Sequence, residues 1–359
     1  MNDLQTTPQR PLVTREVKEE AKRLYDQAIA QGTPPNTARA YKSDFAYFAA
    51  WHEAHFGELP GELPWAVEGM LVFVGHHALQ EMPEDVVERL VEQGRLRRDE
   101  EGRVKMGTVS TLERRLASLS TLHQLAGVPD HLNPRRDPRV REMLKRARKS
   151  AAAAGQRVRK PKAATRPVLD RLVGACNDLE LAGVRDQALL LFAWATGGRR
   201  RSEVCAALVQ DLTETRDPEN PEQIAYWYHL PRHKGDPQGE GADLPVTGRA
   251  AEALEYWLRV SEISEGPIFR RIDRWGNLGD SLSPEAVRLI VKRRAQQAGL
   301  DPAAFSPHSL RSGFATESGL QGVPEAEARA MTRHKSVAVF AGYQQPGNLL
   351  RSKASRMAG

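Results

Sequence analysis

The sequence is poor in the features that mark a secreted or membrane-embedded protein. Its 359 residues include only two cysteines, Cys176 and Cys205, so no disulfide framework holds the fold, and we expect two buried, reduced thiols. No apolar run approaches the roughly 20 residues needed to cross a bilayer. The N-terminus, MNDLQTTPQRPLVTREV, lacks the basic and then apolar order of a signal peptide. These absences favour a protein that works inside the cell.

Acidic residues are scarce in one part of the chain, between residues 135 and 166. The whole chain carries 52 Lys and Arg against 46 Asp and Glu, a net charge of +6 that favours a polyanionic partner. Dense positive charge repels itself unless an anion is near, so this basic run favours a strap that contacts phosphate groups. The alternative is a solvated helix face followed by a soluble linker. The basic residues of the run are Arg135, Arg136, Arg139, Arg141, Lys145, Arg146, Arg148, Lys149, Arg157, Arg159, Lys160, Lys162 and Arg166, against Asp137 and Glu142.

Chain length and breaks in the apolar periodicity predict two domains. The predicted parts are a disordered leader at 1–12, a helical domain at 13–150, a basic linker at 151–165, a second domain at 166–346 and a tail at 347–359. Helices are expected over 14–31, 36–56, 64–77, 110–125, 137–150, 167–179, 183–196, 248–261, 283–299, 310–319 and 324–332, and strands over 224–230 and 242–246. The fold class is therefore mainly α with a small β-hairpin.

Three consecutive arginines, Arg199 to Arg201, follow a nearly apolar helix in the segment ATGGRRRSEV. Arginines beside a core are unfavourable without anionic partners. Ser202 or Glu203 can also begin a helix, whose N-terminus attracts phosphate. The alternative for this segment alone is a salt-bridged surface turn.

Three further segments of the second domain carry reactive side chains. Lys234 lies at the glycine-rich tip of the expected hairpin, where a lysine is usually only solvated. His308 and Arg311 are three residues apart near a helix start, and so share one face. His334 precedes Tyr343 by nine residues (343 − 334), although a tyrosine among small residues is more often a core or surface aromatic.

Taken together, these groups are the set needed to attack a phosphodiester without a metal. The tyrosine supplies the nucleophile. The arginines offset the charge on the non-bridging oxygens as phosphorus becomes five-coordinate. The lysine protonates the departing 5′ oxygen, and the histidines supply hydrogen-bond donors and proton transfer. The sequence therefore predicts DNA strand cleavage through a covalent link to Tyr343.

The same residues resemble the tyrosine recombinase, or phage integrase, family. GRRRSE at 198–203 matches the family's G-x-R-x-S-E box, with Arg200 as the first catalytic arginine and Glu203 in support, and His308 with Arg311 matches its H-x-x-R box. The remaining matches are Lys234 with the hairpin lysine, His334 with a position that is His or Trp, and Tyr343 with the nucleophile. Thr332 and Arg333 replace the usual Leu-Gly before the histidine, which changes the local turn but not the chemistry.

Residues 36–51 and 108–133 resemble the family's helical core-binding domain, so the likeness spans nearly the whole chain. It implies a SAM-like DNA-binding domain and a mostly helical catalytic domain of the DNA breaking-rejoining fold. About a dozen residues precede the first helix, so no extra arm-binding module is expected. Arg199 and Arg201 are then bystanders or DNA contacts. The candidate DNA contacts are Arg199, Arg201, Arg39, Lys42, Arg114, Arg115, Arg146, Lys149, Arg157, Arg159, Lys160 and Lys162.

The resemblance also implies a reaction and an assembly. Cleavage would give a 3′-phosphotyrosine and a free 5′ hydroxyl, and a 5′ hydroxyl from a partner duplex would then exchange strands, with no metal, ATP or other cofactor. Four protomers would act on two duplexes of double-stranded DNA in the cytoplasm, at the nucleoid. Accessory DNA-bending or directionality proteins would be optional partners. The tail, 347–359, is expected to pack into a neighbouring protomer.

Three alternatives stay open. A type IB topoisomerase or a telomere-resolving enzyme would use the same chemistry. A non-catalytic DNA-binding regulator would be expected to lack Tyr343, Arg200 or Arg311, and all three are present. A metalloenzyme could use His229 and His233, an i, i+4 pair, but their segment predicts a strand with no acidic or Cys partner close by.

Neutralising Lys160 and Lys162 is expected to weaken DNA binding, because each phosphate contact releases counterions from the duplex. The slope of log affinity against log salt should fall by about 1 for each contact removed. Binding isotherms over a salt series measure this slope. An unchanged slope would leave the segment as a solvated linker.

Overall fold

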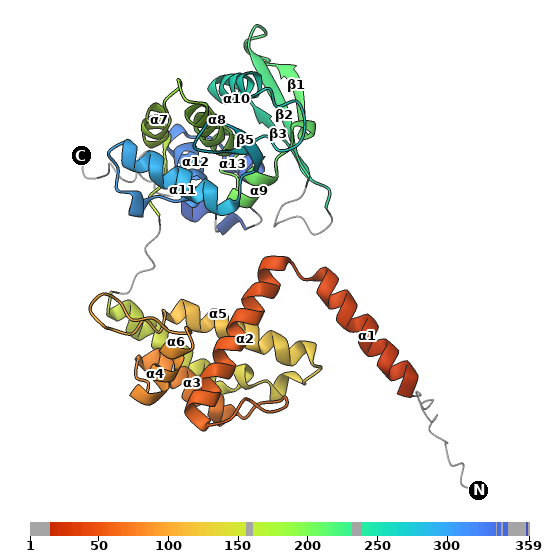
Figure 1. Ribbon diagram of the computed structural model, residues 1–359, viewed down its shortest axis with the longest axis vertical. Helices are drawn as coiled ribbons and strands as arrows, with labels where there is room; N and C mark the ends of the chain where they lie inside the picture. The colour runs from red at the N-terminus through yellow and green to blue at the C-terminus, as the bar shows by residue number, and fades with distance from the viewer. Residues whose placement is uncertain are drawn as a thin grey trace. The chain divides into compact units, whose positions relative to one another are not determined.

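A computed structural model of the chain describes residues 15–155, 161–231, 239–334, 336–338, 340–343 and 357 (Figure 1). The chain divides into two compact units, residues 1–158 and 159–359. Each unit has a hydrophobic core of its own. Within the described residues, we find no helix that combines the length and the apolarity required to span a membrane.

The N-terminal unit is helical. Its α-helices are α1 (Arg15–Gly32), α2 (Pro35–Phe56), α3 (Val67–Leu79), α4 (Glu84–Glu92), α5 (Val109–Leu125) and α6 (Pro138–Ala153). Trp51 of α2 and Phe73 of α3 are fully buried, with ring centroids 4.8 Å apart. α2 packs against α4 and α5, and α3 packs against α6. The sequence predicted these helices to within a few residues, except α4, which it missed.

Charged and aromatic side chains join α2 to α5 inside this unit. The buried carboxylate of Asp44 accepts hydrogen bonds from Arg114 and, at 2.7 Å, from Oγ of Ser118. The guanidinium carbon of Arg115 lies 3.3 Å from the centroid of the Tyr47 ring. Both arginines thus have partners within the unit, and their predicted DNA contacts stay predictions.

The other predicted DNA contacts that the structure describes in this unit are exposed. Arg39 and Lys42 lie on the solvent face of α2, and Arg146 and Lys149 on that of α6. Arg146 Nε donates to Oε1 of Glu142 at 2.9 Å. Exposed ion pairs of this kind are weak, so these side chains remain available to an anion.

The C-terminal unit is mostly helical, and a small three-stranded antiparallel sheet lies at one edge of it (Figure 1). Its elements are α7 (Arg166–Gly174), α8 (Leu181–Ala195), α9 (Arg201–Ala206), β1 (Leu212–Arg216), β2 (Ile224–Leu230), β3 (Ala242–Val246), α10 (Gly248–Ser261), β4 (Arg270–Ile272), β5 (Leu278–Ser281), α11 (Pro284–Gln297), α12 (Pro307–Gln321) and α13 (Glu325–Thr332). The sheet order is β1-β2-β3, and Tyr228 pairs with Leu212 on one side and Leu244 on the other. The buried helix α8 packs against α10, which also covers β2.

The predicted linker, 151–165, differs from the structure at both ends. Residues 151–153 continue α6. Further on, the backbone N–H groups of Lys162 and Ala164 donate to the carbonyl oxygens of Ala304 and Ser309, both at 2.8 Å. A Cβ on Gly313 would lie 2.0 Å from the carbonyl oxygen of Ala164, so glycine permits this close approach. Residues 161–165 therefore belong to the C-terminal unit.

The two cysteines are free, as predicted, but only half-buried rather than buried. Burial raises the pKa of the Cys176 thiol to about 12 and that of Cys205 to about 11. Both thiols are therefore protonated and weakly reactive at neutral pH.

A buried carboxylate, Asp186, ties α8 to α11. Its Oδ1 accepts from Nη2 of Arg185 at 2.7 Å, and its Oδ2 accepts from Nη2 of Arg293 at 2.7 Å and from Nε of Arg294 at 2.9 Å. Asp186 has no exposed surface, and Arg185 and Arg294 are almost as buried. Each buried charge in this cluster therefore depends on the others.

Asp186→Ala should lower the free energy of unfolding by about 3–5 kcal/mol, because it leaves buried guanidinium groups without a counter-charge. Urea denaturation of the full chain measures the loss. The matched control is Asp170→Ala, which removes an exposed ion pair with Arg249 and should change stability by about 0–1 kcal/mol. Equal losses in the two variants would contradict the structural role given to Asp186.

Candidate active site

A double-glycine turn after α8 brings the three arginines against α12 and the end of α13. Gly197 and Gly198 have φ of +85° and +71°, in the left-handed region that favours glycine. A Cβ on Gly197 would lie 2.3 Å from the carbonyl oxygen of Met331, and one on Gly198 would lie 2.1 Å from Cα of Arg311. The two glycines thus permit the backbone contact that assembles the site.

Glu203 fixes Arg200 at the start of α9. Nη1 of Arg200 donates to Oε1 of Glu203 at 2.6 Å, and the backbone N–H of Arg200 donates to Oε2 at 3.1 Å. Glu203 is buried, whereas the Arg200 side chain is 35% exposed. The carboxylate therefore orients a guanidinium that still reaches solvent.

Arg311, on α12, is held by backbone carbonyl groups. Its guanidinium donates to the carbonyl oxygen of Gly198 at 3.2 Å and to that of Thr332. The side chain is only 4% exposed. Burial, followed by the nearby Arg199 and Arg200, lowers its pKa to about 10. Arg311 therefore stays charged at neutral pH, among other cations.

Tyr343 faces His308. Its hydroxyl lies 3.1 Å from Nε2 of His308, within hydrogen-bond distance. Phe340, one turn earlier, is fully buried against Ala315 of α12. Oγ1 of Thr316 also donates to the carbonyl oxygen of Tyr343 at 3.2 Å. The tyrosine backbone is thus docked on α12, while its phenol reaches the predicted catalytic histidine.

His334 lies between Thr332 and Arg311. Its Nδ1 is 2.8 Å from Oγ1 of Thr332, and its Nε2 accepts from Nε of Arg311 at 3.3 Å. Since Nε2 acts as the acceptor, the proton of a neutral imidazole belongs on Nδ1, where the threonine oxygen accepts it. Thr332 therefore fixes the tautomer of His334, a role that the sequence alone did not predict.

Both histidines have lowered pKa values. Burial, then Arg311 and Arg200, lower the pKa of His334 to about 4. The same three causes, in the same order, lower the pKa of His308. Each imidazole is therefore neutral at neutral pH. Nε2 of His308 faces the Tyr343 hydroxyl and can accept its proton, whereas Nε2 of His334 already accepts from Arg311.

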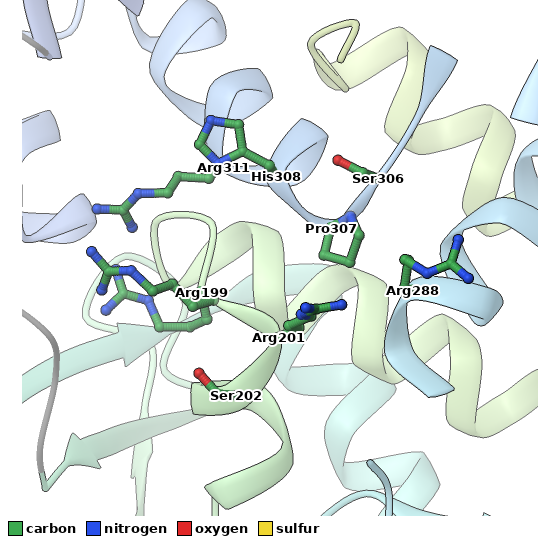
Figure 2. Close-up of a pocket in the computed structure, with 9 residues that line it drawn as sticks. Arg199, Arg201, Ser202, Arg288, Ser306, Pro307, His308 and Arg311 are labelled. Carbon is green, nitrogen blue, oxygen red and sulfur yellow. The ribbon is translucent and has the colours of Figure 1, made fainter. Parts of the chain in front are cut away.

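A pocket of about 360 Å³ opens beside Arg200, His308 and Arg311 (Figure 2). Its lining residues are Arg199, Arg200, Arg201, Ser202, Arg288, Ser306, Pro307, His308 and Arg311. Five of these are arginines, and Figure 2 shows the guanidinium groups of Arg199 and Arg311 on the same side of the pocket. Such a concentration of cations suits an anion with several oxygens, such as a phosphate group.

Arg199 is the most buried of the three consecutive arginines. It is 2% exposed, and its Nη2 donates to the carbonyl oxygen of Met331 at 2.6 Å. Its Nε and Nη1 are buried and have no hydrogen-bond partner among the described residues, although Nη1 lies 3.8 Å from a carboxylate oxygen of Glu203. Burial lowers its pKa to about 10. Arg199 thus links the turn to the end of α13 through a buried hydrogen bond, and its predicted DNA contact stays a prediction.

The sequence analysis missed Arg288, which lines the pocket from α11. Its position on a polar helix face carries no signal that links it to the arginines of α9, because that contact is made only in the fold. Four predicted residues, Lys234, Arg157, Arg159 and Lys160, lie outside the described residues. Lys162 is described and exposed.

The metal alternative depended on His229. This residue lies on β2, as the strand prediction required, and its Nδ1 is 2.7 Å from Oδ1 of Asp243 on β3. The expectation that no acidic group lies close was therefore wrong, because strand pairing brings Asp243 opposite His229. His233 lies outside the described residues, and those that are described contain no group of three or more side chains able to hold a metal ion.

Comparison with known proteins identifies relatives along most of the chain. The sequence model of the phage integrase family matches residues 163–347. An integrase/recombinase XerD homologue from Selenomonas ruminantium is 30% identical over 341 residues, which cover 93% of this chain and 87% of the relative. A tyrosine recombinase XerC from Herpetosiphon aurantiacus is 31% identical over 170 residues, covering 46% of this chain and 49% of the relative.

Solved structures of low sequence identity share the fold. The integrase of the transposon Tn1549, in complex with transposon right end DNA, has a TM-score of 0.54 at 12% identity, covering 94% of this chain and 99% of that chain. A lambda integrase dimer bound to a COC′ core site has a TM-score of 0.50 at 14% identity, covering 89% of this chain and 95% of that chain. The predicted fold class, mainly helical with a small antiparallel sheet, is confirmed.

The imidazole of His334 should titrate near pH 4, well below the ordinary value of about 6.5, because burial and Arg311 disfavour its charged form. Between these two pH values the unfolded chain binds a proton that the folded site does not, so the stability from neutral His334 is lost as pH falls. Imidazole NMR of the full chain measures the midpoint, with His334→Gln to assign the signal. A midpoint near 6.5 would contradict the burial and the contact with Arg311.

Proposed function

Since the chain belongs to the phage integrase family, we propose that it is a site-specific recombinase that cleaves and rejoins DNA through Tyr343. One observation carries this assignment of the nucleophile. The Tyr343 hydroxyl lies 3.1 Å from Nε2 of His308, and His308 lines a pocket together with Arg200 and Arg311. A nucleophile, a proton acceptor and two phosphate-binding cations are therefore neighbours.

Cleavage begins when the phenolic oxygen of Tyr343 attacks the phosphorus of the scissile phosphodiester. The phenolic proton passes to His308, whose lowered pKa leaves it neutral and able to accept. A tyrosine–phosphorus bond forms as the bond to the 5′ oxygen breaks, giving a 3′-phosphotyrosine. The departing 5′ oxygen takes a proton from Lys234, a role that rests on the match to the family pattern.

Arg200 and Arg311 offset the negative charge that develops on the non-bridging oxygens. Glu203 and the carbonyl groups around Arg311 hold these guanidinium groups before DNA binds, so little reorganisation accompanies the reaction. His334, through its contact with Nε of Arg311, helps to orient that side chain. Loss of one such donor typically costs about 3–4 kcal/mol of transition-state stabilisation.

Rejoining is the reverse attack, by the 5′ hydroxyl of a second duplex on the phosphotyrosine. The covalent link keeps a phosphoester bond, so the proposed reaction needs no ATP, metal ion or other cofactor. Exchange requires two duplexes, hence four protomers, in the cytoplasm at the nucleoid of the host. The N-terminal unit would grip the duplex through its exposed basic side chains, and residues 347–359 would pack in a neighbouring protomer. Accessory DNA-bending or directionality proteins would be additional partners.

Two other functions share part of this site. A type IB topoisomerase or a telomere-resolving enzyme would form the same phosphotyrosine, but would act without exchange between two sites. Relaxation of a plasmid without recombination would favour such an enzyme. A regulator without activity would have no need for a phenol at hydrogen-bond distance from His308.

The protein should form a denaturation-resistant adduct with DNA, also in the presence of EDTA. A suitable substrate is a library of nicked duplexes with randomised central sequence, from which covalent adducts are recovered and sequenced. Tyr343→Phe should bind DNA and form no adduct, because it lacks only the nucleophilic oxygen. Arg200→Ala and Arg311→Ala should bind DNA but reduce the adduct by about 100-fold or more.

The control is Tyr256→Phe, which removes a hydroxyl from an exposed tyrosine of α10 in the same unit. It should form the adduct at the wild-type rate. An adduct that persists in Tyr343→Phe would place the nucleophile elsewhere and refute the proposal.

A further inference from the structure

The pocket extends beyond the residues assigned to cleavage. Figure 2 shows Arg201 and Arg288 on one side of the pocket, and Arg199 and Arg311 on the other. Arg201 comes from the first turn of α9, and Arg288 from α11, which packs against α9. The cleavage steps use neither of these two arginines. Their guanidinium groups therefore form a second cationic position in the same pocket.

A carboxylate already bridges these two arginines. Glu285 accepts from Nε of Arg288 at 2.8 Å through Oε1, and from Nη1 of Arg201 at 3.4 Å through Oε2. It is thus a single anion shared between two cations from different helices. The Glu285 side chain is 56% exposed, and those of Arg201 and Arg288 are 48% and 34% exposed. An exposed ion pair is weak, so a stronger anion arriving from solvent can displace this carboxylate.

The position of the proposed cleavage site indicates which anion would bind to Arg201 and Arg288. A DNA strand with its scissile phosphate at Arg200 and Arg311 carries another phosphate about 3.4 Å along the helix axis in each direction. Forked guanidinium groups bind phosphate and carboxylate in the same geometry, so a group that holds Glu285 can also hold a phosphodiester. The backbone of the same strand is therefore the anion that the pocket would meet next.

We infer that Arg201 and Arg288 bind the DNA phosphate next to the scissile one, and that Glu285 occupies this position until DNA displaces it. The inference rests on the proposed function and adds a second phosphate subsite to it. Binding at two adjacent phosphates fixes the register of the strand, so that the scissile phosphorus faces Tyr343. Arg288 is then a positioning residue, and Glu285 a competitor that weakens binding of DNA.

A charge-deletion cycle tests the subsite. Methylphosphonate groups replace single phosphates on either side of the scissile position in a DNA that the wild-type protein cleaves, and adduct formation is measured for wild type, Arg288→Ala and Arg288→Lys. On unmodified DNA, Arg288→Ala should reduce the adduct by about tenfold, and Arg288→Lys should restore part of it. At one flanking position, the methylphosphonate should reduce the adduct yield of the wild-type protein by a similar factor. The same DNA should give Arg288→Ala no lower a yield than unmodified DNA gives it, because the contact is already lost.

Glu285→Gln tests the competing carboxylate. It should tighten DNA binding by up to about fivefold, the size of an exposed ion pair, because the amide removes the negative charge and keeps the side-chain shape. The tightening should disappear in a protein that also carries Arg201→Ala and Arg288→Ala. The surface control is Arg249→Ala, an exposed arginine of α10 that should leave the adduct unchanged. Unchanged melting temperatures verify that each variant folds.

Two outcomes would overturn the inference while leaving the proposed function intact, since the wild-type adduct at Tyr343 would still form. One is that Arg288→Ala lowers the adduct yield by the same factor on unmodified DNA and on every methylphosphonate DNA, so that the two losses are independent. The other is an adduct from Arg288→Ala equal to that of wild type. A wild-type protein without any adduct would instead refute the proposed function itself.

Discussion

The crowding of guanidinium groups around one small pocket is the constraint on which the rest of the C-terminal unit depends. Arg199 and Arg311 are almost completely buried, and burial, followed by repulsion from nearby arginines, lowers the pKa of each guanidinium. Buried cations are tolerated only when neighbouring oxygens accept their hydrogen bonds. Backbone carbonyl groups of Gly198, Met331 and Thr332 supply part of those oxygens, while Nε and Nη1 of Arg199 have no such partner among the described residues. The guanidinium charge that remains uncompensated lies at the pocket, where a bound phosphate would neutralise it.

This constraint explains why distant parts of the chain must meet. Arg199 and Arg200 come from the turn between α8 and α9, whereas Arg311 comes from α12. The acceptors come from that turn and from the end of α13, and the histidine–tyrosine pair comes from α12 and the segment after α13. The double glycine lets the turn approach both partners closely. The buried cluster around Asp186 holds α8 against α11, which carries Arg288. Fold stability and site geometry therefore share the same helices.

Much of this could be predicted from sequence, because the chemistry requires particular side chains at fixed spacings. The groups around Arg200, His308 and Tyr343 were recognisable, and strong apolar periodicity located most helices. The pairing of His229 with Asp243 could not be predicted, since cross-strand register is set by the folded sheet. The tautomer of His334 and the place of Arg288 could not be predicted either, because both depend on contacts with other helices that form only in the fold.

The most direct test of the central claim is the chemical identity of the residue joined to DNA. Nuclease and protease digestion of the wild-type adduct, followed by mass spectrometry, reveals the modified peptide and the nucleotide attached to it. The account predicts a peptide containing Tyr343 linked to the 3′ phosphate of a nucleotide. A different modified residue, or a link to a 5′ phosphate, would contradict it.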